Sequence, residues 1–400
     1  MKQQTVLDTN ISVDRLVPGG QGIGTLPGGK KAFLWNTLPG ETVTEFLVTK
    51  KKSHYIEGIA TKFENPSKFR VEPKDTCYLS TSPWQILDYT YELEQKRALV
   101  AESLRQEHVA VSDGVEIKPT GTDGKQWFYR NKMEYSLFWA KEDSMIHLAF
   151  HARGSHQKFP IEKSSIEKPE IFSAAKQIVD ELNRNREDSR KYQSMLLRAS
   201  SDGTVSGGLF ENRQPHPIFN NLKDTILGQT YSYSPNGFFQ INLPVYELAL
   251  KEIKQHIKTD KVLDLYSGVG TIGLSVARDK DLTLVESDKS AYRELENNCQ
   301  GTTATPVFAK SEDALEYIAP DLTVILDPPR AGCEKKLILK LLDETPEKII
   351  YLSCNPSTQS RDVKLLESKY IIEQIAPFNF FPKTPHIENL IVLRRKESVL

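Results

Sequence analysis

The C-terminal part of the chain alternates apolar runs with helix-like segments, and this alternation constrains the fold more than any other sequence feature. Four apolar strand candidates occur after residue 226, in the stretches VLDLYSGVGTIGLSVA, LTLVESD, LTVILDPPR and KIIYLSC. Strands that alternate with helices indicate βαβ units and a mainly parallel sheet. Ligands of such sheets bind beyond the carboxyl ends of the strands. The sequence therefore predicts an α/β domain over 226–400 with a binding site along that edge.

The N-terminal part has a different pattern. Residues 4–64 alternate polar and apolar positions between Gly/Pro turns, which predicts a small closed β-barrel of the SH3-like or OB-like kind over 1–65. Residues 84–108 place apolar side chains on one face of a helix. Strand-like segments follow, with one helix near 168–184, so 66–225 is expected to form a mixed α+β central domain whose helix 84–108 docks on the C-terminal domain.

Composition narrows the class of protein. The 52 Lys and Arg residues nearly balance the 53 Asp and Glu residues, so net charge gives no footprint for nucleic acid. The four cysteines show no Cys-x-x-Cys pair, which argues against a zinc site and a disulfide framework. The N-terminus lacks the apolar core of a signal peptide, and no apolar run approaches the ~20 residues that span a bilayer. We expect a monomeric cytoplasmic protein that binds no membrane and no metal.

A glycine-rich motif follows the first strand of the C-terminal domain. The stretch DLYSGVGTIG runs from Asp264 to Gly273, and Glu286 ends the next strand. The motif satisfies G-x-G-x-x-G, which fits a nicotinamide or flavin dinucleotide, and equally the S-adenosylmethionine loop of a class I methyltransferase. The acidic residue that opens it, Asp264, favours the methyl donor over a dinucleotide, and together with the three aligned glycines it argues against a plain tight turn.

Two further strands end in polar residues. Asp327 precedes two prolines and an arginine, and the prolines end the strand and hold the carboxylate at the sheet edge. Cys354 follows KIIYLS and precedes Asn-Pro, whereas Cys299 and Cys333 fit the ordinary role of a buried apolar residue. A thiol in a polar turn is exposed enough to ionise and to act as a nucleophile.

The last motif is FFPKTPHIENLIVL, residues 380–393. Its Glu388 stands between two apolar runs. A solvated carboxylate is the simpler interpretation, but a carboxyl group held in an apolar cleft has a raised pKa and suits general-base catalysis.

Together, in this order and spacing, the four motifs resemble the RNA uracil-5-methyltransferase family, which forms 5-methyluridine in tRNA and 23S ribosomal RNA. The segment SPNGFFQIN, 234–242, looks like that family's cofactor segment, and YRNKMEYSL, 129–137, is similar to its central-domain signature. Residues 4–64 look like the TRAM domain, an RNA-binding barrel of the 23S-type members. The resemblance implies a Rossmann-like class I methyltransferase domain, S-adenosylmethionine as cofactor and RNA as partner.

The resemblance also assigns roles to residues. Cys354 is expected to add to C6 of uracil and Glu388 to remove the C5 proton after methyl transfer. The expected cofactor contacts are Gln240, Tyr266, Gly268, Thr271, Glu286 and Asp327. Thr271 replaces an asparagine frequent in the family, and a further contact near Ser311 to Asp313 aligns too loosely to assign.

The chain departs from the family pattern in the cysteines that would bind an iron–sulfur cluster. The 23S-type members commonly carry four cysteines for a [4Fe–4S] cluster, three of them just after the barrel. The matching segment here, RVEPKDTCYLSTSPWQ, holds Cys77 alone, so no cluster is expected.

Several alternatives remain open. The barrel favours 23S ribosomal RNA as the substrate, and tRNA is the second candidate. An RNA cytosine-5-methyltransferase would also use a thiol, an NAD-dependent oxidoreductase would use the glycine loop, and a non-catalytic RNA-binding factor would keep the scaffold. The SCNP segment disfavours a cytosine-5-methyltransferase. An oxidoreductase would leave Cys354 and Glu388 unexplained. A non-catalytic factor does not account for the intact Cys354, Glu388 and Asp327.

Overall fold

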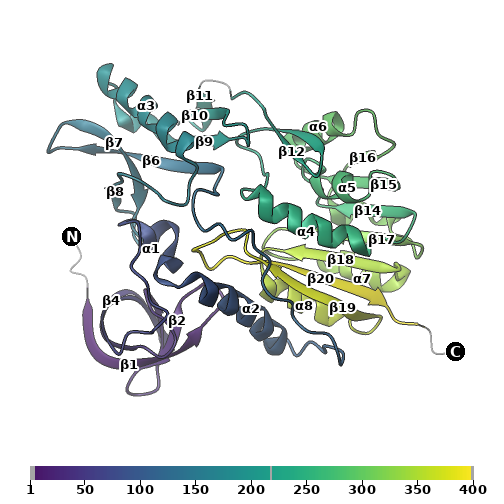
Figure 1. Ribbon diagram of the computed structural model, residues 1–400, viewed down its shortest axis with the longest axis horizontal. Helices are drawn as coiled ribbons and strands as arrows, with labels where there is room; N and C mark the ends of the chain where they lie inside the picture. The colour runs from purple at the N-terminus through teal and green to yellow at the C-terminus, as the bar shows by residue number, and fades with distance from the viewer. Residues whose placement is uncertain (1–4, 217–218, 398–400) are drawn as a thin grey trace.

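The computed structural model describes residues 5–216 and 219–397, which form a barrel, a central sheet and a C-terminal sheet (Figure 1). The barrel lies at lower left in the figure, the central sheet above it and the C-terminal sheet to the right. The loop between the last two strands, in yellow, reaches from the C-terminal sheet toward the other two parts.

The N-terminal barrel is closed, with strand order β1-β2-β3-β5-β4. Alternate side chains point inward and form a core of their own, which includes Ile11, Leu34 and Phe46. The strands are β1 (Val6–Leu16), β2 (Gly22–Thr25), β3 (Lys31–Trp35), β4 (Thr42–Lys51) and β5 (Tyr55–Glu64). The predicted barrel is confirmed.

The expected helix 84–108 is shorter in the structure. A turn α1 (Tyr78–Thr81) and a 3₁₀ turn η1 (Pro83–Ile86) precede α2 (Tyr89–Gln106). The Asp88 side chain accepts hydrogen bonds from the backbone N–H groups of Thr90 and Tyr91, so the helix begins after it. The sequence prediction missed this cap and extended the helix by five residues at its start.

The central sheet has six strands in the order β11-β10-β9-β6-β7-β8, and helix α3 covers one face. The elements are β6 (Lys132–Ala140), β7 (Met145–His151), β8 (Lys158–Pro160), α3 (Pro169–Arg184), η2 (Ser189–Lys191), β9 (Tyr192–Ala199), β10 (Val205–Glu211) and β11 (Gln214–His216). The hairpin β12 (Leu222–Ile226) and β13 (Gln229–Tyr233) follows, and its side chains pack in one cluster with α4 (Leu243–His256) of the C-terminal part. The expected junction at 225/226 thus falls inside β12.

The C-terminal sheet has seven strands in the order β16-β15-β14-β17-β18-β20-β19. Only β20 runs against the others, because β14 to β18 pair in parallel and β20 pairs antiparallel with both β18 and β19. Its elements are β14 (Lys261–Leu265), α5 (Thr271–Val276), β15 (Asp281–Glu286), α6 (Lys289–Asn298), β16 (Thr305–Phe308), η3 (Ser311–Asp313), η4 (Leu315–Tyr317), β17 (Leu322–Leu326), α7 (Lys335–Glu344), β18 (Lys348–Ser353), α8 (Pro356–Leu366), β19 (Tyr370–Phe378) and β20 (Glu388–Arg395). The predicted α/β, Rossmann-like class is confirmed.

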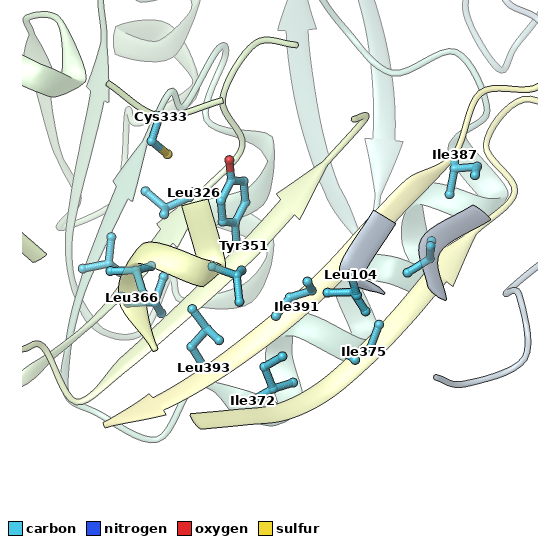
Figure 2. Close-up of a cluster of buried hydrophobic side chains, with 14 of the residues drawn as sticks. Leu104, Leu326, Cys333, Tyr351, Leu366, Ile372, Ile375, Ile387, Ile391 and Leu393 are labelled. Carbon is cyan, nitrogen blue, oxygen red and sulfur yellow. The ribbon is translucent and has the colours of Figure 1, made fainter. Parts of the chain in front are cut away.

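Each face of the C-terminal sheet buries its own cluster. Helices α4, α5 and α6 cover one face, and α2, α7 and α8 cover the other. Figure 2 shows Leu104 of α2 beside Ile375 and Ile391 of the last two strands. Leu16 and Leu38 of the barrel belong to this second cluster as well. The barrel and α2 are therefore packed into the same core as the C-terminal sheet.

Candidate active site

The predicted site residues lie at the point where the strand order reverses. From β14 the chain moves outward through β15 to β16 and then returns to β17 on the other side of β14. The loops after β14 and β17 diverge there, and this is where ligands of doubly wound sheets bind. Tyr266, Glu286, Asp327 and Cys354 all lie at the carboxyl ends of parallel strands, so the sequence prediction of one shared edge is confirmed.

The glycine loop opens a space above the sheet. Tyr266, Gly268 and Gly270 have φ angles of +62°, +58° and +86°, and Gly270 caps the N-terminus of α5. A Cβ atom on Gly268 would meet nothing within 4 Å, whereas one on Gly273 would lie 2.8 Å from Asp264 Oδ2. Gly268 therefore borders open space, and Gly273 allows α5 to pack closely on β14.

Two carboxylates support this loop. Glu286 Oε2 accepts a hydrogen bond from the Gly268 N–H at 2.8 Å, and Oε1 accepts one from Ser287 N–H at 2.7 Å. Asp264 is fully buried, and its Oδ2 accepts from Gly273 N–H at 2.9 Å. Burial raises the pKa of Asp264 to about 8. Its Oδ1 has no hydrogen-bond partner among the residues that the structure describes.

Gln240 is buried, and residues of the central sheet hold its backbone in place. Asn131 Nδ2 donates to the Gln240 carbonyl at 3.1 Å. The Arg198 guanidinium donates to the Gly237 carbonyl at 3.1 Å and to the Phe239 carbonyl. Sequence reasoning missed Asn131 and Arg198. The signal for Arg198 was a cation at the end of the apolar run SMLLRA, which a buried strand holds only when the charge has partners.

Of the remaining positions considered for cofactor binding, some lie at the glycine loop and one does not. Thr271 is buried at the first position of α5. The Ser311 hydroxyl accepts from the Tyr266 N–H at 3.0 Å and so belongs to the loop. Asp313 instead forms an ion pair with Lys336 of α7 at 2.5 Å. Ser311 supports the glycine loop, and Asp313 is engaged elsewhere.

Cys354 lies between β18 and α8 and is half-buried. The Asn355 side chain caps α8 by accepting from Ser357 N–H at 3.2 Å, and its Nδ2 donates to the Arg330 carbonyl at 2.9 Å. The turn that carries the thiol is thus bonded to the loop that follows Asp327. Burial raises the pKa of the Cys354 thiol to about 11, with further contributions from the nearby carboxyl groups and an opposing one from Arg330.

Glu388 is the first residue of β20 and is 4% exposed. Burial, and then the charge of Asp327, raise its pKa well above the usual range, while Arg330 opposes this shift. Burial also raises the pKa of Asp327 to about 7. The site therefore brings together a thiol, two carboxyl groups and one guanidinium, close enough for their charges to shift pKa values within the group. Arg330, which sequence reasoning left without a role, is the cation of this group.

A buried ion cluster holds the loop before Glu388. Glu92 and Lys96 of α2 are 0% exposed and lie 3.2 Å apart. Lys96 Nζ donates to Asn379 Oδ1 at 2.5 Å, and Glu92 accepts from Asn379 Nδ2 at 3.0 Å and from Lys383 N–H at 2.9 Å. Sequence reasoning missed this cluster, although the Glu and Lys four residues apart gave a signal. It fixes the path of residues 379–387.

Metal ligands do not gather within residues 5–216 and 219–397, where no group of three or more His, Cys, Asp or Glu side chains could hold an ion. Cys77 is buried in the core of the central sheet. The expectation that no iron–sulfur cluster binds stays a prediction. None of the helices in the described part of the chain is long and apolar enough to cross a membrane.

Comparison with known proteins points to one group. Residues 314–396 match the sequence profile described as "tRNA (Uracil-5-)-methyltransferase". An Enterococcus faecalis protein named "Uncharacterized RNA methyltransferase" is 28% identical over 91% of this chain and 92% of its own length. A Bacillus cereus protein of the same name is 27% identical, with 96% of both chains covered.

A solved structure shares the fold. The Pyrococcus abyssi tRNA (uracil-54, C5)-methyltransferase, solved in complex with S-adenosyl-L-homocysteine, superposes with a TM-score of 0.73. It is 24% identical, and the match covers 96% of this chain and 100% of that one. The expected resemblance to the RNA uracil-5-methyltransferase family is confirmed by the matching profile, the relatives named RNA methyltransferases and the shared fold.

Proposed function

We propose that this protein transfers a methyl group from S-adenosylmethionine to C5 of a uridine in RNA, with Cys354 as nucleophile and Glu388 as proton acceptor. One observation carries the proposal. The Cys354 thiol, at the end of β18, and the buried carboxyl group of Glu388, at the start of β20, lie close enough that the carboxyl group raises the pKa of the thiol. Cys333, the alternative nucleophile, is buried and its pKa is raised to about 12, so it suits a core role.

The residues of the loop fit the cofactor. Open space above Gly268 leaves room for a ligand against the backbone, and Glu286 presents oxygens at the end of β15. The Oδ1 of buried Asp264 has no hydrogen-bond partner among the described residues, and a cation in that space would favour the ionised form of this carboxyl group. Gln240, Tyr266, Gly268, Thr271, Glu286 and Asp327 are the residues that would hold the cofactor. S-adenosylmethionine supplies an electrophilic methyl group on a sulfonium cation.

The residues would act in sequence on one ring. The Cys354 sulfur, as thiolate, forms a bond to C6, and the C5–C6 electron pair shifts to give an enolate at O4. Carbon C5 of the enolate would then form a bond to the methyl group while the bond between that methyl group and the sulfonium sulfur breaks, which leaves S-adenosylhomocysteine. Glu388 takes the proton from C5, the double bond forms again, and the sulfur leaves as thiolate. Because C6 is hidden in a stacked helix, the target base must be unpaired or flipped out.

The charges of the site support this order of events. In the free protein, burial keeps the thiol of Cys354 protonated at pH 7 and favours the protonated form of Glu388. A positive charge in the adjoining cofactor space stabilises the ionised forms of both groups. A cationic cofactor in that space would therefore increase the fraction of reactive thiolate.

Methylation of unmodified total RNA with labelled S-adenosylmethionine tests the proposal. The expected product is 5-methyluridine, identified by mass spectrometry of the nucleosides. RNA that contains 5-fluorouridine at the target should form a stable covalent adduct, because fluorine cannot be removed from C5 as a proton is. The Cys354→Ala variant is the control and should form no adduct. A methylated cytidine as the product, or an adduct with Cys354→Ala, would contradict the assignment.

We further propose 23S ribosomal RNA as the substrate, with the barrel as an RNA-binding TRAM-like domain that contacts RNA through backbone and stacking. Transfer RNA is the second candidate, because the matching profile and the Pyrococcus abyssi relative both carry tRNA in their names. Separate reactions with unmodified 23S ribosomal RNA and unmodified tRNA distinguish them. Methylation of tRNA alone would contradict the first choice.

A further inference from the structure

Two turns of the barrel have the same sequence and the same hydrogen bonding. They are Pro18-Gly19-Gly20, between β1 and β2, and Pro27-Gly28-Gly29, between β2 and β3. In the first turn Gly20 N–H donates to the Val17 carbonyl at 2.8 Å, and in the second Gly29 N–H donates to Leu26 at 3.0 Å. The chain thus contains an internal comparison between two equivalent turns.

Their surroundings differ. A Cβ atom on Gly28 or Gly29 would meet nothing within 4 Å. A Cβ atom on Gly20 would lie 2.3 Å from Pro385 Cβ, and the Gly20 carbonyl accepts from Trp84 Nε1 at 3.0 Å. Pro385 belongs to the loop that ends at Glu388. The first turn is therefore fitted onto the candidate active site, while the second faces open space.

Beside this contact lies a cavity of about 190 Å³. Cys354, Arg330 and His386 line it from the C-terminal sheet, and Pro18, Gly19 and Leu99 line it from the barrel and α2. A cavity of roughly 150 Å³ is enough for one benzene ring, so this one has room for a single nucleobase. Three parts of the chain build it together.

The lining of this cavity leaves out the groups that must face C5. Glu388, Asp327 and the glycine loop are not among its lining residues, although both carboxyl groups act on the Cys354 thiol. The target uracil needs C5 beside Glu388 and the cofactor loop. A uracil placed on the carboxyl side of the Cys354 thiol would leave this cavity, on the barrel side, for the part of the RNA that continues from the target nucleotide.

The lining chemistry matches a nucleotide. Pro18 and Leu99 provide apolar surface for a ring, and Arg330 Nη2 lies 3.5 Å from His386 Nδ1 at the polar side. A guanidinium suits a phosphate, and apolar or aromatic surfaces suit the face of an unstacked base. We propose that this cavity receives the nucleotide next to the target uridine, so that the first turn of the barrel takes part directly in substrate recognition. The inference rests on the proposed function.

Two matched variants test it. Pro18→Trp places an indole at the cavity, and Pro27→Trp places the same side chain on the equivalent turn in open space. Both prolines are exposed, so equal melting temperatures are expected. The probe is a heptamer with one uridine between three adenosines on each side, measured by fluorescence anisotropy with S-adenosylhomocysteine present. We expect Pro18→Trp to weaken binding at least fivefold and Pro27→Trp less than twofold.

Abasic RNA identifies what the cavity holds. Removing the base on one side of the uridine should weaken binding by the wild-type protein at least fivefold, and by Pro18→Trp less than twofold further. Equal affinities of the two variants, additive losses, or no binding by the wild-type protein would overturn the proposal. Methyl transfer to the heptamer is measured in parallel. The expected binding pattern, together with no transfer to the heptamer or to unmodified total RNA, supports the cavity assignment and refutes the proposed function.

Discussion

At the scale of single residues, the proposed methyl transfer depends on groups whose ionisation is suppressed by burial. Cys354, Asp327 and Glu388 were all predictable from the sequence, because each follows or begins an apolar strand and strand ends share one edge. Arg330 stood in the same motif, but its influence on the thiol depends on distances that the sequence does not give. The raised pKa of Glu388 followed from its apolar neighbours, whereas the part due to Asp327 required the fold.

The ionisation of Cys354 gives a first prediction. Its thiol pKa of about 11 is raised partly by the charges of Glu388 and Asp327, so Glu388→Gln should lower it. Each unit of decrease raises the thiolate fraction at pH 9 about tenfold. The rate of alkylation by iodoacetamide should rise accordingly, and Cys354→Ala gives the background from other thiols. An unchanged rate profile in Glu388→Gln would show that the carboxyl group does not act on the thiol.

The second prediction concerns turnover. Glu388→Gln should still form the covalent intermediate and transfer the methyl group, but release should slow by about 10²- to 10⁴-fold, the usual range for a lost general base. Denaturing gels of RNA reacted with this variant should show an accumulated protein–RNA adduct. Normal turnover by Glu388→Gln would remove the residue from the base role.

At the scale of elements, α2 and the loop 379–387 act as one unit. The sequence predicted an amphipathic helix but not that Glu92 and Lys96 face inward, since charged residues at helical spacing usually indicate a solvated face. Their partners lie nearly 300 residues away in the chain, and such pairings cannot be read from local pattern. The same reason hid the contacts from Asn131 and Arg198 to the segment of Gln240.

Breaking the ion cluster gives a third prediction. Glu92→Gln leaves Lys96 and Lys383 buried without a carboxylate, and should lower the free energy of unfolding by about 3–5 kcal/mol. Adding Lys96→Met should recover part of the loss, because one uncompensated charge is removed. The control is Arg105→Gln, which breaks an exposed pair with Glu102 and should have little effect. Urea denaturation measures all of these, and equal midpoints for Glu92→Gln and Arg105→Gln would contradict the role of the cluster.

At the scale of the whole molecule, the barrel and the C-terminal sheet share a buried core, whereas the central sheet has a core of its own. The sequence predicted a barrel, a central region and a parallel sheet in the right order, because strand and helix periodicities are local. It did not predict that Leu38 of the barrel would be buried in the same cluster as the C-terminal sheet. Packing between distant segments depends on three-dimensional shape, which periodicity does not encode.

The shared core gives a fourth prediction. Leu38→Ala should lower the free energy of unfolding by about 2–5 kcal/mol and shift the unfolding of the entire chain. Leu34→Ala, in the barrel's own core, is the comparison. Thermal unfolding followed by circular dichroism and by tryptophan fluorescence should show one transition that moves in both variants. A separate early transition that alone responds to Leu38→Ala would show that the barrel unfolds independently.

The bond between Trp84 and the first Pro-Gly-Gly turn has a consequence for protein engineering. If the barrel binds RNA as proposed, an exchange of barrels between relatives would change which RNA is modified. A crossover placed directly after β5 would pair a foreign turn with the native Trp84 and Pro385, and a side chain in place of Gly20 would collide there. The unit suited to recombination therefore extends from the N-terminus through α2, and the loop 379–387 should be transplanted with it.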